Sequence, residues 1–404
     1  MPDIAIVGAG ISGLHLALRL QQAGVATTLY AERTAEELAA GPPPNLAVRF
    51  DHTRQRERQL GVAPWDSPEY GMYGATFSAL GEQELGFWGN LSKPGSAVDF
   101  RLYLPRLMAD YENRGGTVEI VAPDAETVAR LGDRHDLVVV ASGRRGVAGL
   151  FPRDPERSPY AEPQRRITAG LFRGVAAHPR NGLHYQLCPG VGEIFSICLL
   201  TARGPMTGIN LEAIPGGPLE YLSHRSPAEG LVKAVLTEIA EHAPAFRDRI
   251  DEREFDLAGP DELLQGGITP TVRVGWTALA EGKYAVAVGD AWVVNDPVTG
   301  QGANLASHSA FVLAEQILAG PPYDEAWCRT TEARMWEFAR PVTEWTNAFL
   351  QPPPPHAVEV LAAASQDQRV ADAFLDNFND PPAQWNALAT PEGAAAWLRS
   401  VRGQ

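Results

Sequence analysis

The sequence predicts an α/β fold in three parts: a parallel sheet covered by helices, an inserted antiparallel β-rich domain and a helical C-terminal region. Short, wholly apolar runs near both ends of the chain are typical of parallel strands buried on both faces. Mixed apolar segments separated by Gly, Pro and Asn turns fill the middle, which favours an antiparallel sheet. A chain of 404 residues also exceeds what one hydrophobic core usually covers, so two domains are expected.

The N-terminal segment has the pattern of a β-α-β unit. Residues 4–7 are apolar, residues 11–23 carry leucines among small residues and end at a helix stop at Gly24, and residues 27–31 resemble a second strand. The tail beyond residue 320 is predicted to be helical, with breaks at Pro341 and at the proline run 352–355. The other predicted elements are strands at 117–121, 136–141, 167–172, 194–200 and 283–288, and helices at 227–242 and 303–318.

Three glycines follow the first predicted strand in the pattern GxGxxG: Gly8, Gly10 and Gly13. The first permits a tight turn, the second lets a pyrophosphate approach the backbone, and the third lets the helix pack against the sheet. Glu32 ends the second strand, where a carboxylate binds ribose hydroxyls. The pattern predicts a dinucleotide with an unphosphorylated ribose, FAD or NAD. Further candidate contacts beside this motif are Ser12 and Arg33.

A second glycine-rich region follows the apolar run 283–288. Asp290 lies at the carboxyl end of that strand, where parallel sheets bind ligands, and its carboxylate can accept hydrogen bonds from ribitol hydroxyls. The segment 296–304 supplies a turn and a helix start whose free amides suit the pyrimidine edge of a flavin. Two such segments, remote in sequence, favour FAD. The candidate FAD-binding residues here are Gly289, Asp290, Pro297, Gly300, Gln301, Gly302, Ala303 and Asn304.

Composition and missing motifs exclude several classes of protein. The formal net charge of −15 argues against a broad nucleic-acid surface, and no run reaches the ~18 apolar residues of a membrane span. The three cysteines form no CxxC pair, and neither HExxH nor GxSxG occurs, so no metal and no side-chain nucleophile are predicted. His15, beside the glycines, is interpreted as structural. We expect a soluble, cytoplasmic protein that binds neither nucleic acid nor membrane and leaves the chemistry to its cofactor.

The sequence resembles the flavin-binding epoxidase component of two-component styrene and indole monooxygenases, the group E flavoprotein monooxygenases, over nearly its whole length. The matching segments are 6–10, 13–16, 97–103, 264–267, 289–290, 296–298, 300–304, 345–347 and 376–379. The resemblance implies a para-hydroxybenzoate-hydroxylase-like fold with a Rossmann-like FAD-binding domain. We place the FAD-binding domain at 1–68, 99–160 and 276–320, the substrate domain at 69–98 and 161–275, and the C-terminal helical region at 321–404.

The resemblance also implies a reaction. A separate NADH-dependent flavin reductase would supply reduced FAD, which would react with O2 to give a C4a-hydroperoxyflavin. That species would oxygenate a small aromatic substrate: an aryl alkene, an indole-like heteroarene or an aryl sulfide. Ser142 and Gly143, both candidate FAD contacts, stand where single-component hydroxylases usually carry Asp-Gly, so the signature of direct reaction with NAD(P)H is missing. The oligomeric state stays open, with a homodimer as one option.

The substrate pocket is where the resemblance weakens. Asn45 agrees with the styrene type and is the candidate catalytic residue, because it would orient the substrate or the flavin edge. Residues 42–44 are prolines where the family carries an arginine near the flavin, and Arg101 is a candidate substitute in FAD binding. The implied substrate-pocket residues are Ala47, Met72, Ala75, Gln265, Gly266, Pro297 and Val298. The positions that match neither the styrene nor the indole type are Ala47, Arg49, Met72, Ala75 and Gly95.

Three alternatives are compatible with part of the sequence. A single-component NAD(P)H-dependent aromatic hydroxylase would have its FAD bleached by NADH alone. A halogenase is disfavoured because the sequence contains no WxWxIP motif. A non-catalytic binding module with a flavoprotein fold would bind no FAD, and the intact segments 289–290 and 300–304 argue against it.

Overall fold

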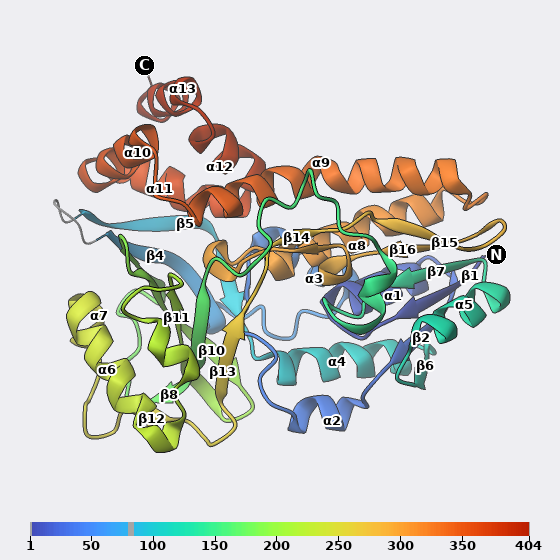
Figure 1. Ribbon diagram of the computed structural model, residues 1–404, viewed down its shortest axis with the longest axis horizontal. Coiled ribbons are helices and arrows are strands. Elements are labelled where there is room, and N and C mark those ends of the chain that lie inside the picture. Colours follow the sequence, from blue (N-terminus) through green and yellow to red (C-terminus); the bar gives the residue numbers. More distant parts are fainter. Residues whose placement is uncertain (1, 80–84, 404) are drawn as a thin grey trace.

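The computed structural model describes residues 2–79 and 85–403, and Figure 1 shows its three parts. A largely parallel sheet with its helices occupies the right of the view, and a second, mostly antiparallel sheet occupies the left. Helices of the C-terminal region lie across the top. This arrangement confirms the predicted fold class.

The first sheet has six strands in the order β15-β16-β7-β1-β2-β6. All neighbours are parallel except β15 and β16, which form an antiparallel pair. Its strands are β1 (Asp3–Val7), β2 (Ala26–Ala31), β6 (Thr117–Ile120), β7 (Leu137–Val140), β15 (Trp276–Ala280) and β16 (Lys283–Ala287). The helices that share its hydrophobic core include α1 (Ile11–Gln22), α4 (Phe100–Asn113), α5 (Ala125–Arg134) and α8 (Gly302–Leu318). Residues 4–7 of β1 and all of β7 are apolar and buried, as expected for strands in the middle of a parallel sheet.

The second sheet has the order β12-β8-β11-β10-β9-β4-β5-β3, with β13 also paired to β8. Its neighbours are antiparallel except β4 and β9. The strands are β3 (Val48–Arg49), β4 (Gly71–Ala79), β5 (Leu85–Ala97), β8 (Arg166–Arg173), β9 (Leu183–Cys188), β10 (Gly192–Thr201), β11 (Gly204–Ala213), β12 (Asp256–Leu257) and β13 (Leu263–Gly267). Helices α6 (Leu231–His242) and α7 (Pro244–Arg247) share a core with one face of this sheet. Because side chains alternate along a strand, the other face is free to line a cavity.

The C-terminal region is helical, as predicted, but one predicted break is wrong. Helix α9 (Glu325–Phe349) continues through Pro341, although a proline removes a helix hydrogen bond. The burial of Val342 and Trp345, each 0% exposed, offsets this cost by packing the following turn into the core. The helices that follow the proline run are α10 (Pro355–Gln366), α11 (Gln368–Asp376), α12 (Pro381–Leu388) and α13 (Pro391–Arg402). Helix α11 packs on β5 (Figure 1).

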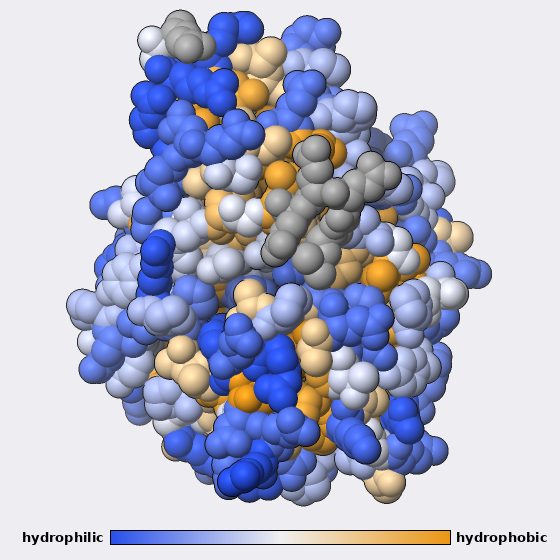
Figure 2. Space-filling model, turned by 90° about the vertical axis from the view of Figure 1, so that its left-hand side faces the viewer, coloured by the Kyte–Doolittle hydropathy of each residue, from blue (hydrophilic) through white to orange (hydrophobic). Residues whose placement is uncertain are grey.

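Shorter elements complete the described chain. They are α2 (Ala35–Ala40), α3 (Asp51–Leu60) and the paired strands β14 (Thr271–Val272) and β17 (Val293–Val294). None of the described helices is long and apolar enough to cross a membrane. On the face drawn in Figure 2, hydrophilic residues predominate and hydrophobic residues appear in small separate areas.

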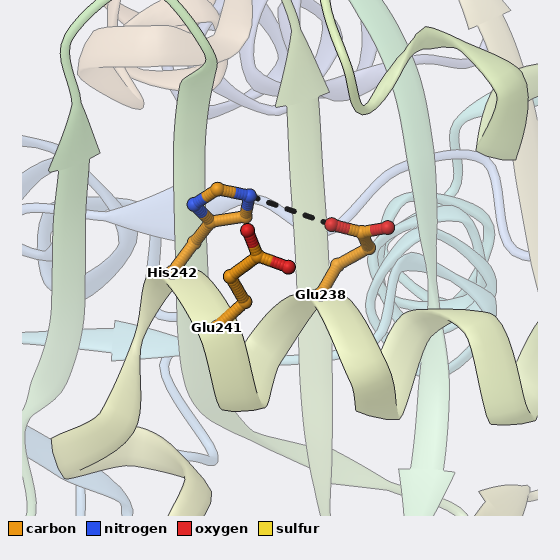
Figure 3. A group of neighbouring side chains, drawn as sticks. All are labelled: Glu238, Glu241 and His242. Carbon is orange, nitrogen blue, oxygen red and sulfur yellow. Dashed lines mark ion pairs between the residues drawn. The ribbon is translucent and has the colours of Figure 1, made fainter.

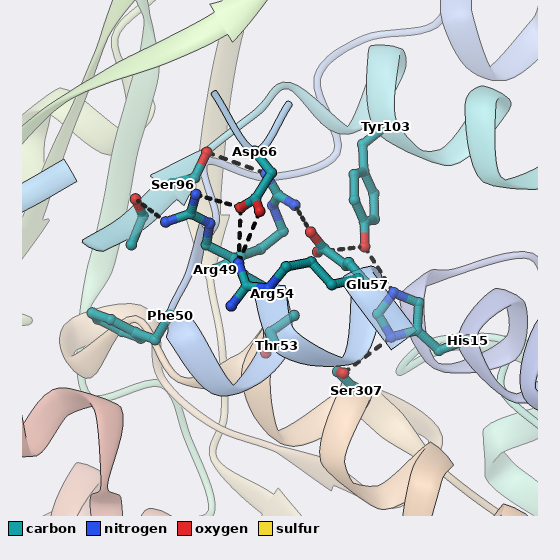
Figure 4. Close-up of polar contacts among 12 residues, drawn as sticks. His15, Arg49, Phe50, Thr53, Arg54, Glu57, Asp66, Ser96, Tyr103 and Ser307 are labelled. Atoms are coloured by element: carbon teal, nitrogen blue, oxygen red, sulfur yellow. Dashed lines mark hydrogen bonds and ion pairs between the residues drawn. The ribbon is translucent and has the colours of Figure 1, made fainter. Parts of the chain in front are cut away.

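A buried chain of hydrogen bonds joins α8, α1, α4 and α3 (Figure 4). Ser307 on α8 contacts His15 on α1 at 3.0 Å, and His15 contacts the hydroxyl of Tyr103 on α4 at 2.8 Å. Tyr103 donates to Glu57 on α3, which also forms an ion pair with Arg49. Burial lowers the pKa of His15 to about 3, so its imidazole is neutral and acts in this network. This confirms His15 as a structural residue.

Candidate functional site

One cavity of about 620 Å³ lies between the carboxyl ends of the parallel strands and the open face of the second sheet. It reaches from the glycines after β1 to aromatic side chains on the second sheet, to Leu375 on α11 and to Phe378 just beyond that helix. The predicted site residues that line it are Gly8, Gly10, Ser12, Glu32, Arg33, Asn45, Ala47, Met72, Ala75, Ser142, Gly143, Gln265, Gly266, Asp290, Pro297, Val298, Gly300, Gly302 and Ala303. Both glycine-rich segments therefore meet at one site.

The first glycine turn is shaped by close contact with neighbouring backbone. Gly8 has φ +116°, and a Cβ there would lie 2.5 Å from the carbonyl of Ala141. A Cβ on Gly13 would lie 1.9 Å from the Gly8 oxygen, so the third glycine allows α1 to pack on the turn. Gly10 is different, because a Cβ there would only reach 3.8 Å from Ala141. The protein leaves that space free, as a ligand that approaches the helix amides requires.

Asp290 presents a carboxylate to the cavity from the end of β16. Its side chain is accessible through the cavity, while surrounding protein desolvates the carboxyl and raises its pKa. The nearby Arg144 and Arg273 oppose that rise. Gly289, just before it, has φ +59°, and a Cβ there would lie 2.6 Å from the Ser12 hydroxyl oxygen. Gly289 therefore shapes the turn that directs Asp290 toward the cavity, and Gly289 itself does not line the cavity.

Two further residues predicted to bind FAD instead hold the surrounding loops together. The Asn304 Oδ1 accepts hydrogen bonds from the Phe50 amide and the Thr53 hydroxyl, each at 2.8 Å. Its Nδ2 donates to the carbonyls of Val48 and Gly300, each at 3.0 Å. Gln301 donates from Nε2 to a carbonyl of the C-terminal region at 3.0 Å. Neither residue lines the cavity, and the hydrogen bonds of both side chains join separate segments of the chain.

Arg101 lies outside the main cavity. Its guanidinium forms ion pairs with Asp99 and Glu262, the second at 2.8 Å, and it lines a separate recess of about 480 Å³. In this structure its donors are therefore directed to the two carboxylates, and its role in FAD binding stays a prediction. Arg33, in contrast, lines the main cavity.

The substrate end of the cavity is apolar and aromatic. Tyr185 on β9 stacks on Phe77 with ring centroids 4.9 Å apart, and Phe195 meets Tyr185 edge-on at 4.6 Å. Leu375 and Phe378 close this end from the C-terminal region. We had not predicted these residues from the sequence. The alternation of apolar and other residues along β9 and β10 was the available signal, but it does not say which face meets a cavity.

Several buried polar atoms around the cavity have no hydrogen-bond partner among the described residues. They include Asn45 Oδ1, the Ser142 hydroxyl and both amide atoms of Asn295. An unpaired buried polar group is costly, so these atoms fit a polar ligand that completes them. Together with the free turn at Gly10 and the carboxylate of Asp290, they provide what a long flavin nucleotide needs.

A group of three possible metal ligands lies outside this cavity. Glu238, Glu241 and His242 project from the end of α6 and are the one grouping of possible metal ligands found in the described chain (Figure 3). His242 pairs with Glu238 at 3.4 Å, and Glu238 also accepts a hydrogen bond from Tyr221. These contacts account for the cluster as helix-surface ion pairing.

Comparisons with known proteins decide the family. Residues 143–249, which include β8 to β11 and α6, match the family described as "Styrene monooxygenase A putative substrate binding domain". Styrene monooxygenase StyA of Pseudomonas fluorescens is 37% identical over 401 residues, which are 98% of this chain and 97% of that protein. The chain belongs to the styrene monooxygenase A family.

A second relative, StyA of a Pseudomonas species, is 38% identical over 401 residues, which are 98% of this chain and 97% of that protein. Solved structures share the fold of this chain. The flavin-dependent brominase Bmp2 matches with a TM-score of 0.72 over 100% of both chains at 13% identity. PqsL of P. aeruginosa matches with a TM-score of 0.62 over 96% of this chain and 100% of its own, at 15% identity. At such identities the likeness shows the fold alone.

Proposed function

We propose that this styrene monooxygenase family member is an FAD-dependent epoxidase of the two-component type. It uses reduced FAD from a separate flavin reductase, together with O2, to oxygenate an aryl alkene, an indole-like heteroarene or an aryl sulfide. The observation that supports this most is one cavity that joins both FAD-binding segments to an aromatic pocket, in a chain 37–38% identical to StyA over 98% of its length.

The residues around the cavity fit FAD. The amides at the start of α1 would bind the pyrophosphate, Glu32 would accept hydrogen bonds from ribose hydroxyls, and Asp290 would accept them from the ribitol chain. The turn 297–300 and the first amides of α8 would hold the isoalloxazine. When bound and reduced, FAD supplies the activation of O2 and the transfer of one oxygen atom.

The aromatic end of the cavity selects a flat, apolar substrate. Phe77, Tyr185 and Phe195 give the pocket aromatic faces and edges that pack on another ring. These side chains also exclude water, which protects a reactive oxygen donor from wasteful breakdown. Asn45 has an unpartnered oxygen at the cavity wall, so it can orient the substrate or the flavin edge by accepting a hydrogen bond.

The proposal is tested with purified protein, FAD, NADH, catalase and a generic flavin reductase. We expect styrene oxide from styrene, indigo from indole or sulfoxide from thioanisole, and no product when either protein is omitted. Absence of every product in the complete mixture would contradict the proposal. Rapid bleaching of bound FAD by NADH without the reductase would favour the single-component hydroxylase instead.

A further inference from the structure

A cluster of buried charged groups lies behind the loop that borders the flavin site. Glu193 on β10 and Glu212 on β11 are 1% and 0% exposed, and Asp296 is 1% exposed. Arg165, just before β8, is the cation that faces them, and Tyr185 is a further titratable neighbour. Three carboxyls therefore share the field of one guanidinium.

The hydrogen bonds assign that guanidinium to one carboxylate. Arg165 donates from Nε and from a terminal nitrogen to the two oxygens of Glu193, at 2.7 and 2.8 Å. This bidentate pair is the strong arrangement for a buried carboxylate. Within residues 2–79 and 85–403, Glu212 and Asp296 form no ion pair with a cation of their own. If both were ionised, the cluster would bury a net charge of about −2, which burial in a low dielectric strongly opposes.

The oxygens of the remaining two carboxyls show where a proton fits. Glu212 Oε1 accepts from Asn210 at 2.6 Å, and Asp296 Oδ1 accepts from the Val298 amide at 3.1 Å. The other oxygen of each, Glu212 Oε2 and Asp296 Oδ2, is buried without a donor among the described residues. The two carboxyls also lie close enough for Asp296 to raise the pKa of Glu212. Two carboxylates hold only lone pairs, so a hydrogen bond between these two buried carboxyls requires a proton on one of them.

We propose that Glu212 and Asp296 share one proton at neutral pH, and that this proton positions the flavin-bordering loop. This inference rests on the proposed function. Asp296 caps the turn Pro297–Thr299, whose residues line the cavity, while Glu212 belongs to the second sheet. A hydrogen bond through the shared proton would thus join the loop to the second sheet, which carries the aromatic pocket. Both residues are positioning residues, since neither is placed against the reacting atoms.

The pH dependence follows from the raised pKa of both carboxyls. Burial is the main cause of the rise for each, and the charge of Asp296 raises the pKa of Glu212 further. A raised carboxyl pKa means that the ordered loop prefers the protonated pair. Loss of the proton at higher pH leaves two carboxylates in contact and displaces the loop. The dissociation constant for oxidised FAD should then rise with pH, by up to about tenfold per pH unit for one linked proton.

Infrared spectroscopy of the full-length apo-protein tests the proton directly. We expect a protonated-carboxylic-acid C=O band at pH 7 that disappears in Glu212→Gln, where an amide can donate to Asp296 without titrating. Glu359→Gln is the matched control, because Glu359 is an exposed carboxylate on α10, and it should keep the band. A wild-type spectrum without the band, or a band unchanged in Glu212→Gln, would overturn the shared proton.

FAD titrations followed by flavin fluorescence test the positioning role. The wild type and Glu359→Gln should lose affinity as pH rises from 6 to 9, whereas Glu212→Gln should bind with an affinity that does not change with pH. Identical pH profiles in wild type and Glu212→Gln would overturn the role of the proton in the loop. A protein that shows the infrared band but binds no FAD at any pH would contradict the proposed function and not the proton.

Discussion

Gly13→Ala tests whether the first glycine turn is fixed by packing and in turn fixes FAD. The added Cβ would start 1.9 Å from the Gly8 carbonyl oxygen and 3.1 Å from its carbon, whereas real Cβ atoms do not approach below 3.0 Å. The opposing atoms are backbone, so the turn and α1 must move apart. Overpacking of this kind costs about 1–3 kcal/mol of stability.

The same displacement moves the amides that face the pyrophosphate. We expect the dissociation constant for FAD to rise about 10- to 100-fold, equivalent to ~1.4–2.7 kcal/mol. The assays are fluorescence titration with FAD and urea denaturation. Gly149→Ala is the matched control, because a Cβ there meets nothing within 4 Å, and both quantities should stay at the wild-type value. A Gly13→Ala protein with unchanged stability and FAD affinity would refute this account of the turn.

Three further substitutions probe other parts of the site. Asp290→Asn removes the carboxylate that opens to the cavity, so FAD should bind about tenfold more weakly, measured by titration; unchanged binding would argue against a ribitol contact. Glu57→Gln leaves the buried guanidinium of Arg49 without its charged partner and should lower the free energy of unfolding, measured in urea, by about 3–5 kcal/mol. A loss below ~1 kcal/mol would contradict a buried ion pair between Arg49 and Glu57. Asn304→Ala removes four hydrogen bonds and should cost ~2–4 kcal/mol in the same assay, whereas a loss confined to FAD affinity would restore the direct role first assigned to it.

The parallel sheet and its glycine turns could be predicted because their signals are local. The run Ile4–Val7 must be buried on both faces, and the glycines that follow it are required by contacts between adjacent segments. The cavity lined by both glycine-rich segments follows from the general rule that ligands bind at the carboxyl ends of parallel strands. The resemblance to a family then connected these local signals to one reaction.

What could not be predicted depends on long-range partners. Arg101, Gln301 and Asn304 lie in segments typical of FAD binding, yet each contacts a residue 77 to 254 positions away that no local pattern reveals. Pro341 lies inside a helix because the residues after it pack into the core. The pair formed by Glu212 and Asp296 was hidden for the same reason, since each residue alone resembles an ordinary strand or turn carboxylate.

A single-turnover experiment tests the central claim most directly. FAD is photoreduced without NADH, mixed with the protein and styrene, and exposed to O2 in the presence of catalase. The account predicts styrene oxide in an amount up to one per reduced FAD, with no reductase or nicotinamide present. No epoxide under these conditions, with epoxide formed once NADH is added to the protein alone, would contradict the two-component epoxidase.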